Sequence, residues 1–551
     1  MDNYQARQLL SNFMKRLENT GKRYSIPGNI ITDDEYAAMS LLSGMQEPDA
    51  EPINILNEHI GVSTRAADAK IAMNLDCLNA VVGSLPTLCL DFGTAFSKAA
   101  IWKDGASEPI VLNLNMVAGG GEKPPVESSV YISNGVVYFG PSASRRYRED
   151  NDPDRAMFTS PKELLTHQPE YIESDRPDVD VDPEQKFKSK DLLTLYLAYL
   201  TALCGKCLND IGIKDTLARR FAAPGWHNAQ IGEENSEFDA VIRKMTRYLI
   251  DAQIMANSIP FETWRDGINA DDAQSLLRQM ADVYDNEKWN NCAIVDRAVL
   301  EAVAASVGIE EQMVNERPQV MVIDVGAGTI DIGLFKYSLP GRGARVSPYK
   351  KGLSAFAKAG NYLDRALIAL ARSEANTGSD GVLERKFLKS MRDQVRDRKQ
   401  ELFEDHSVSI HIDGIPDITI TLEQFRNYKD VKDIIGDFRA EIVATITRVG
   451  GENFTGVTAH NIVVFTGGGG GIPFFREVFD QPIQLQSGTA DFLIQNSTPS
   501  WIDATDVAMV DSFPQLAVAT GGCSPYLPLE VRAVSDTRTA PARHLVTGYR
   551  S

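Results

Sequence analysis

Two segments of this chain repeat one plan, and this duplication constrains the fold more than any other feature of the sequence. Residues 88–102 read LCLDFGTAFSKAAIW, and residues 320–335 read VMVIDVGAGTIDIGLF. Each segment predicts an apolar strand, an aspartate, a turn with glycine and threonine, and a second strand. The two aspartates, Asp91 and Asp324, are 233 residues apart. That separation is too long for a solenoid repeat and favours two similar lobes in an α/β protein.

A third glycine motif follows the two hairpins. Residues 463–466 form an apolar strand, five glycines run from Gly467 to Gly471, and PFFREVF then has the spacing of an amphipathic helix. A loop without side chains lets backbone N–H groups approach a nucleotide. Glycine runs also occur in flexible connectors, so the order of all three motifs is what favours a nucleotide site.

Length and composition exclude some classes of function. A chain of 551 residues is long for one core, and two to four domains are expected. The net charge of −19 argues against a nucleic-acid partner, because phosphate backbones are held by clustered Lys and Arg. Charged residues interrupt the apolar stretches before the roughly 18 residues that a membrane span needs. Six scattered cysteines and a charged N-terminus indicate a cytoplasmic protein.

Changes in periodicity divide the chain. We expect a helical N-terminal extension, two lobes, a return of the chain to the first lobe and a polar tail: residues 1–86, 87–315, 316–497, 498–530 and 531–551. The first lobe includes a helical insertion at about 230–290, and the second has an upper subdomain of helices and strands at about 360–440. Residues 191–213 predict one apolar helix. We also predict a single helix over residues 295–308, VDRAVLEAVAASVG.

The hairpins carry groups that can bind phosphate. Gly93 and Gly326 follow the aspartates by two residues, so each tight turn can offer N–H groups to phosphate oxygens. Thr94 and Thr329 add hydroxyl donors to the same turns.

Carboxylates in the same hairpins predict a Mg²⁺ site. Asp91, Asp324 and Asp331 supply oxygen ligands, directly or through water, for a magnesium ion on the phosphates. Ordinary β-turns are also rich in Asp and Gly. Three turns in this order favour instead a polyphosphate clamped between two lobes, with the polyglycine loop over the nucleoside.

This order of motifs resembles the superfamily of actin, 70-kDa heat-shock chaperone and sugar kinase ATPases. Its marks here are a first phosphate hairpin (DFGTAFSK, 91–98), a second (DVGAGTID, 324–331) and an adenosine loop (FTGGGGGIP, 465–473). Over residues 88–525 the chain looks most like the ATPase domain of the DnaK-type chaperones. The resemblance implies a two-lobed actin-like fold of duplicated RNase H-like lobes, with ATP or ADP and Mg²⁺ as ligands.

The resemblance also implies roles for individual residues. FTSPKELL (158–165) would bring Lys162 to the γ-phosphate, and Glu301 in LEAVAASVG would help to place an attacking water, with Asp324 and Thr329 completing the catalytic set. A solvated lysine and a surface carboxylate are the alternatives for Lys162 and Glu301. The implied nucleotide contacts are Asp91, Gly93, Thr94, Ala95, Gly326, Ala327, Gly328, Thr329, Gly360, Lys399, Gly467, Gly468 and Gly469. The implied reaction is slow, Mg²⁺-dependent hydrolysis of ATP by an in-line water.

Several residues depart from the chaperone pattern. Ala95 and Phe96 stand where the chaperones carry hydroxyl side chains, and Gly469 and Gly471 replace a serine and a base-stacking arginine. Pro224 matches the chaperones' switch proline, but no arginine follows at the expected offset. The chaperones' linker and peptide-binding domain have no counterpart after LAVATGG (516–522). We therefore expect a protein partner to bind through the N-terminal extension or the helical insertion.

Three functions compete. The first is a nucleotide-gated switch that closes its lobes on ATP and signals to a protein partner. The second is an actin-like filament-forming ATPase that uses the same site. The third is a sugar-kinase-type phosphotransferase, which would need a general base in the first lobe that the sequence does not reveal.

Overall fold

The computed structural model describes residues 71–160, 162, 165, 172–223, 237–307, 319–338, 345–375, 381–456 and 460–527. All of them belong to one compact unit that begins at Lys70. Most of the expected N-terminal extension, the tail at 531–551 and Pro224 lie outside the described residues. Where the extension is described, at residues 71–86, its regular structure is the short 3₁₀ helix η1 (Asp76–Asn79).

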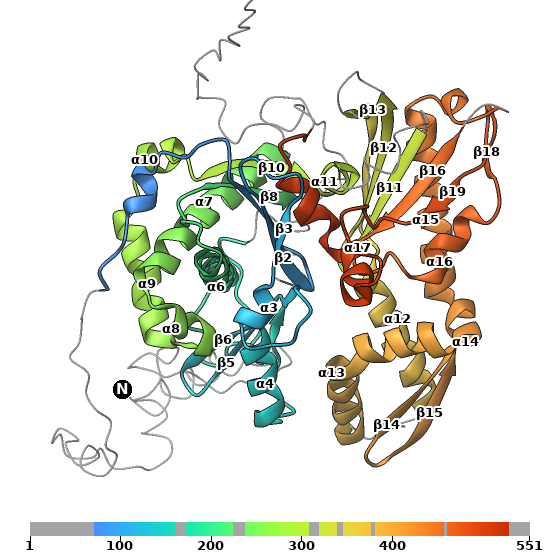
Figure 1. Cartoon of the computed structure of the whole chain (residues 1–551). Coiled ribbons are helices and arrows are strands. Elements are labelled where there is room, and N and C mark those ends of the chain that lie inside the picture. The colour runs from blue at the N-terminus through green and yellow to red at the C-terminus, as the bar shows by residue number, and fades with distance from the viewer. Residues whose placement is uncertain are drawn as a thin grey trace, which may run out of the picture. The chain divides into compact units, whose positions relative to one another are not determined.

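Lobe I is built on a mixed sheet with the strand order β3-β2-β1-β8-β10 (Figure 1). Its strands are β1 (Thr87–Asp91), β2 (Phe96–Trp102), β3 (Ile110–Leu112), β8 (Ala218–Ala223) and β10 (Val295–Leu300), with β4 (Val126–Glu127) paired to β2 beside this path. β2 is antiparallel to β1 and β3, whereas β8 runs parallel to both β1 and β10. Strands covered on both faces read as continuous apolar runs, which accounts for the complete burial of β1 and β8.

Lobe II repeats this sheet in the order β13-β12-β11-β16-β19. Its strands are β11 (Gln319–Val325), β12 (Ile330–Ser338), β13 (Arg345–Phe356), β16 (Asn461–Thr466) and β19 (Leu493–Gln495). The directions match those of lobe I, since β12 is antiparallel to both neighbours while β11, β16 and β19 are parallel. The duplication predicted from the hairpins is confirmed: the molecule is an α/β protein with two actin-like, RNase H-like lobes.

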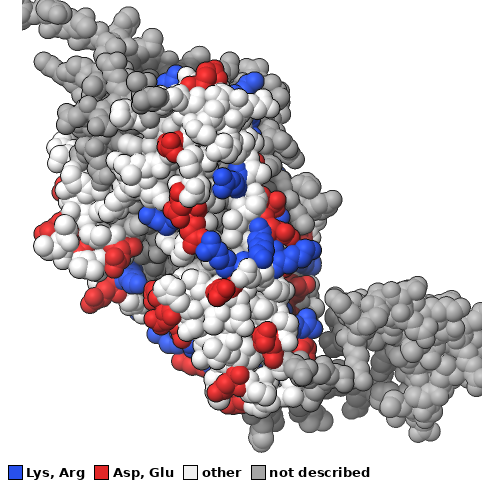
Figure 2. Space-filling model, turned by 90° about the vertical axis from the view of Figure 1, so that its right-hand side faces the viewer, with Lys and Arg blue, Asp and Glu red and all other residues white. Residues whose placement is uncertain are grey.

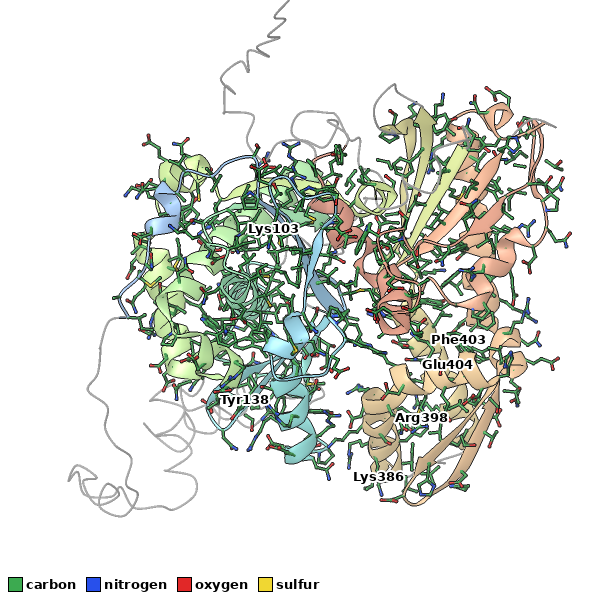
Figure 3. The ribbon with its side chains drawn as sticks, viewed as in Figure 1. Lys103, Tyr138, Lys386, Arg398, Phe403 and Glu404 are labelled. Carbon is green, nitrogen blue, oxygen red and sulfur yellow. The ribbon has the colours of Figure 1, made fainter. Side chains whose placement is uncertain are left out.

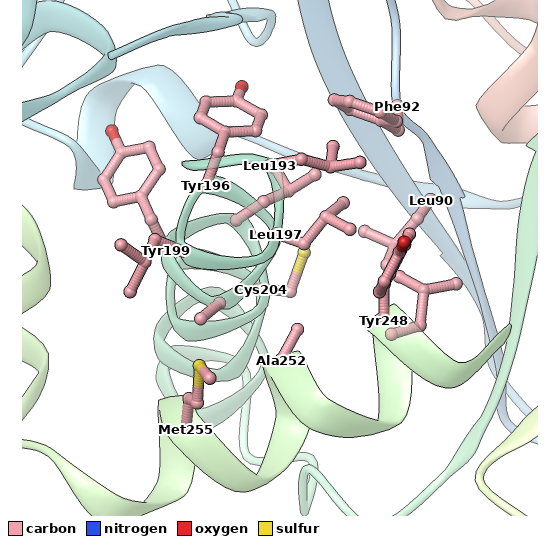
Figure 4. Close-up of a cluster of buried hydrophobic side chains, with 14 of the residues drawn as sticks. Leu90, Phe92, Leu193, Tyr196, Leu197, Tyr199, Cys204, Tyr248, Ala252 and Met255 are labelled. Atoms are coloured by element: carbon pink, nitrogen blue, oxygen red, sulfur yellow. The ribbon is translucent and has the colours of Figure 1, made fainter. Parts of the chain in front are cut away.

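Further elements of lobe I surround a buried helix. They are α3 (Leu114–Val117), β5 (Ser129–Ser133), β6 (Val136–Phe139), α4 (Gly140–Asp150), β7 (Phe158–Thr159), α6 (Ser189–Asp210), α7 (Glu237–Ser258), α8 (Phe261–Asp266), β9 (Ile268–Asn269), α9 (Ala270–Val283) and α10 (Asn286–Asn291). Figure 4 shows Leu193 and Tyr196 of α6 near Phe92, with Ala252 of α7 on another side of the same helix. The helices expected at 191–213 and within the 230–290 insertion are present.

α6 is the long apolar helix of lobe I. By length and composition this one helix could cross a membrane, and 78% of its most apolar window is buried inside the protein. Its uncharged run, residues 192–205 between Asp191 and Lys206, is shorter than the roughly 18 residues that a membrane span needs. A helix that is apolar on all sides needs a buried environment, which in lobe I is supplied by the sheet and by α7.

Residues 360–448 of lobe II form a group of helices with one strand pair. It contains α12 (Gly360–Ala375), α13 (Gly381–Asp405), the hairpin of β14 (Ser407–Ile412) and β15 (Ile415–Thr421), α14 (Leu422–Asn427) and α15 (Lys429–Arg448). η3 (Gly451–Asn453), η4 (Glu477–Phe479), β17 (Ile483–Leu485) and β18 (Gly488–Ala490) complete the lobe. After the glycine run, α16 (Pro473–Arg476) is a single turn, shorter than the amphipathic pattern suggests.

Two helices lie between the sheets. α11 (Glu301–Val307) follows β10, and α17 (Val507–Gly522) packs against α11, β1, β2 and β8 as well as β16 (Figure 1). Their crossing is close, because a Cβ on Gly521 would overlap the carbonyl of Ala304. A shared apolar cluster that includes Val303, Val322 and Leu516 joins both lobes to these helices.

One predicted helix is wrong in its first half. Residues 295–308 were expected to form a single helix, but Val295–Leu300 form β10 and only Glu301–Val307 are helical. A short apolar run fits either structure, so local pattern does not separate them. Parallel pairing with β8 decides in favour of the strand.

Candidate functional site

The first hairpin places Asp91 at the end of β1 with its side chain buried. The turn that follows contains Gly93, Thr94 and Ala95, and glycine is required because a Cβ on Gly93 would overlap the carbonyl of Phe96. Ser128 fixes this turn. Its hydroxyl donates to the Gly93 carbonyl at 2.8 Å, and its N–H donates to the Ala95 carbonyl at 2.8 Å.

The second hairpin is closed by its own backbone. The Gly326 N–H donates to the Thr329 carbonyl at 2.9 Å, so Ala327 and Gly328 form the tip. The Thr329 hydroxyl donates to Asp331 Oδ2 at 3.0 Å. Asp324 lies at the other side of the hairpin, where it accepts a hydrogen bond of 2.7 Å from the Thr466 hydroxyl of β16.

The polyglycine loop rests on the second hairpin. The Gly469 N–H donates to the Val325 carbonyl at 2.9 Å, and the Gly467 N–H donates to the Pro514 carbonyl of α17 at 2.6 Å. Gly467 has a φ of 80°, which glycine adopts without strain. These two N–H groups are used within the protein, so contacts of Gly467 and Gly469 with a nucleoside would be van der Waals contacts. Gly468 lies beside Gln515.

Two more predicted residues meet beside the second hairpin. The Gly360 and Asn361 N–H groups at the start of α12 donate to the carbonyls of Gly326 and Ala327 at 3.3 and 2.7 Å. Lys399 of α13 donates to the Gly360 carbonyl at 3.1 Å and pairs with Asp364 at 2.5 Å. The structure therefore brings Gly326, Ala327, Gly360 and Lys399 together.

An ion pair connects the two predicted catalytic residues of lobe I. The Lys162 ammonium donates to Glu301 Oε1, and both side chains are less than 10% exposed. Burial alone would lower the pKa of Lys162, but the carboxylates of Glu301, Asp91 and Asp331 outweigh burial and raise it. Lys162 and Glu301 are therefore buried partners, and the alternative of two solvated surface residues is wrong.

Asp324 experiences charges from both lobes. Burial and the neighbouring carboxylates of Glu301 and Asp91 raise the pKa of Asp324 to about 7, against the opposing effects of the Thr466 hydrogen bond and Lys98. Asp324 is therefore influenced by Asp91 and Glu301 of lobe I, while its hydrogen bond to Thr466 connects it to the strand that leads into the polyglycine loop.

Lys98 and Ser128 are functional candidates that sequence reasoning missed. Lys98 pairs with Asp91 Oδ2 at 3.0 Å, and its side chain is 13% exposed. Its position in β2, directly opposite Asp91 in the hairpin register, is the signal that could have revealed it. The sequence gives no such signal for Ser128, because this residue follows β4 and lies 35 residues after Gly93 in the turn that it contacts.

Charge in this region is unbalanced. Four buried carboxylates (Asp91, Glu301, Asp324 and Asp331) face two lysines, Lys98 and Lys162. A divalent cation would offset the excess negative charge, so the donor set fits the expected Mg²⁺. Within the described part of the chain, no three His, Cys, Asp or Glu side chains are grouped closely enough to hold a metal ion by themselves. Of the two forms of the prediction, Mg²⁺ held by these carboxylates through water molecules agrees with this spacing.

Two of the six cysteines, Cys204 and Cys207, are separated by only two residues, and both have a structural role. Cys204 and Cys207 lie buried in α6, and burial raises the pKa of each thiol, that of Cys207 to about 12. Such thiols are poor metal ligands and poor nucleophiles.

The sequence matches no protein-family model, and comparison with curated proteins yields no relative.

Proposed function

We propose that this chain is a nucleotide-gated switch, an ATPase of the heat-shock-chaperone type that changes conformation between ATP and ADP to control a protein partner. The observation that carries the proposal is the convergence of two duplicated Asp–Gly hairpins with the Lys162–Glu301 pair. A duplicated actin-like fold is compatible with this function. Six buried cysteines suit the reducing cytoplasm, where we place the protein.

The proposed chemistry distributes roles over these residues. The turn N–H groups and the hydroxyls of Thr94 and Thr329 would hold the phosphates. Lys162 would contact the γ-phosphate, while Glu301, oriented by its bond to Lys162, would place the attacking water. Asp91, Asp324 and Asp331 would hold Mg²⁺ through water. When bound, that ion would neutralise charge developing on the transferred phosphoryl group.

Equilibrium binding of a fluorescent ATP analogue, with and without Mg²⁺, tests the site. We expect Asp91→Asn to weaken Mg²⁺-dependent binding about tenfold or more, because it removes a buried charge from the ion's environment. Asp104→Asn is the matched control, since Asp104 is exposed in the turn after β2. Equal affinity in the wild type and both variants would refute the site.

Two further measurements separate the competing functions. Sedimentation with and without ATP detects filaments, and ATP-dependent pelleting would replace the switch by a filament-forming ATPase. Release of inorganic phosphate without any acceptor would contradict a phosphotransferase.

A further inference from the structure

A groove on lobe II lies outside the nucleotide site. It has a volume of about 510 Å³ and is lined by α12 and the first half of α13. Its apolar lining consists of the partly buried Ile368, Ala369 and Leu388. The exposed Arg365, Arg372 and Ser373 complete it. None of these six residues belongs to the predicted nucleotide contacts.

Helix α13 adds positive charge beside the groove. From Arg385 to Lys399 it carries seven Lys or Arg residues but only two acidic residues, Asp393 and Asp397. Two of the seven, Lys386 and Arg398, are labelled on this helix in Figure 3. Arg385, Arg392 and Arg396 recur at helical spacing on one exposed face. The acidic residues of this helix lie mainly toward its two ends, at Glu384, Glu401, Glu404 and Asp405, so the positive charge is confined to this central stretch.

Four of the seven cations on α13 already have acidic partners: Lys386 lies near Asp413, Arg396 and Lys399 near Asp364, and Arg398 near Glu401. Arg372 pairs with Glu384 at 2.6 Å, and Arg396 lies 3.9 Å from Asp364. Arg365 lies over the ring of Tyr362, 5.7 Å from its centroid. In the described parts of the chain, the ion pairs include none with Arg365, Arg385 or Arg392. Guanidinium groups are therefore available at the rim and beside it.

We infer that this groove docks an acidic segment of a partner protein, with an apolar side chain on the floor and carboxylates on the arginines. Arginine binds carboxylates through paired hydrogen bonds, and an apolar anchor in a pocket supplies most of the affinity in small interfaces. A nucleic acid fits less well, because none of the six lining residues is aromatic and could stack on a base. The inference concerns where a partner binds and does not require a working nucleotide site.

The test uses a fluorescent synthetic peptide in which one leucine lies between runs of glutamate. Its binding to the full chain is followed by anisotropy without nucleotide. The variant Arg365→Glu/Arg372→Glu reverses the rim charge. The control Lys429→Glu/Lys432→Glu makes the same charge change on exposed positions of α15. Figure 2 shows basic and acidic side chains intermixed on the face of lobe II turned to the viewer.

We expect the rim variant to bind at least about tenfold more weakly and the control less than about threefold more weakly, because close charge pairs outweigh distant ones. Ile368→Ala should weaken the leucine peptide severalfold but leave a serine-substituted peptide unchanged. The inference is overturned if the wild type does not bind, if both reversals have equal effect, or if duplex DNA binds the rim more tightly than the peptide. Loss of ATP binding with intact peptide binding would contradict the switch alone.

Discussion

At the scale of single residues, the site is governed by charges removed from water. Lys162 and Glu301 are both less than 10% exposed and face each other from different segments of lobe I. A buried ion pair adds little net stability, but loss of one partner leaves a buried charge without compensation. Their mutual dependence is therefore open to measurement independently of catalysis.

Lys162→Met should lower the free energy of unfolding by about 3 kcal/mol, because Glu301 then stays buried without a counter-charge. The double variant Lys162→Met/Glu301→Gln should recover most of this loss and remain unable to hydrolyse ATP. Urea denaturation and phosphate release measure the two effects. Additive losses of stability in the double variant would contradict the pairing.

Asp324 predicts a dependence of stability on pH. Its pKa is raised to about 7 in the folded protein, so the folded state binds its proton more tightly than the unfolded state does. The contribution of Asp324 to stability is therefore greatest at low pH and is lost as the pH rises toward 7.

Asp324→Asn removes the carboxyl group that binds this proton. The free energy of unfolding of the variant minus that of the wild type should be about 2–3 kcal/mol larger at pH 8 than at pH 5. Urea unfolding of both proteins at the two pH values measures the difference, which cancels other titrating groups such as Asp251. A constant offset between the two proteins would contradict the raised pKa.

At the scale of elements, close backbone approaches hold the site together. The polyglycine loop bonds to the end of β11, and α11 crosses α17 where Gly521 meets Ala304. Both contacts depend on the absence of a Cβ atom. For each contact the chain offers a control glycine, Gly471 or Gly436, where an added Cβ would have no atom within 4 Å.

Gly467→Ala should destabilise the protein by about 2 kcal/mol, since it has a φ of 80° and its Cβ would overlap the Val325 carbonyl. Gly471→Ala is the control in the same loop, because a Cβ there meets no atom within 4 Å. Thermal unfolding of the two variants compares them. Equal melting temperatures would show that the loop does not rest on β11.

Gly521→Ala should push α17 away from α11 and lower stability by about 2 kcal/mol, as overpacked sites do. Gly436→Ala, on the exposed side of α15, should instead raise stability by about 0.5–1 kcal/mol, because alanine favours a helix. Urea denaturation measures both variants. A neutral or stabilising Gly521→Ala would contradict the close crossing.

At the scale of the whole molecule, each lobe has its own core, and a third cluster around α11 and α17 joins the two sheets. The proposed ligand groups come from both sides of this junction, because Asp91 belongs to lobe I and Asp324 to lobe II. A nucleotide bound by both lobes would stabilise them as one unit.

Saturating Mg²⁺–ATP, at about 100 times its dissociation constant, should therefore stabilise the wild type by about 2.7 kcal/mol. The transition should be a single one, as followed by calorimetry. Asp91→Asn should lose most of this gain, although its substitution lies in lobe I alone. Two separate transitions, with only one shifted by ATP, would contradict binding between the lobes.

Local patterns predicted much of this molecule. The two hairpins, the apolar α6 and the helices and strand pair of the upper subdomain follow from alternation, periodicity and turn residues. β10 was missed because a short apolar run becomes a strand only when β8 lies beside it. Ser128 and Thr466 were missed because their partners are distant in sequence.

The sequence by itself determined two related halves, each with an Asp–Gly hairpin, because strand and turn preferences act over a few neighbouring residues. Only the tertiary structure decided that Lys162 is buried against Glu301 and that Lys98 neutralises Asp91. It alone formed the arginine-rimmed groove between α12 and α13. Burial and charge pairing are properties of the packed chain, and they depend on contacts between segments that the local sequence does not specify.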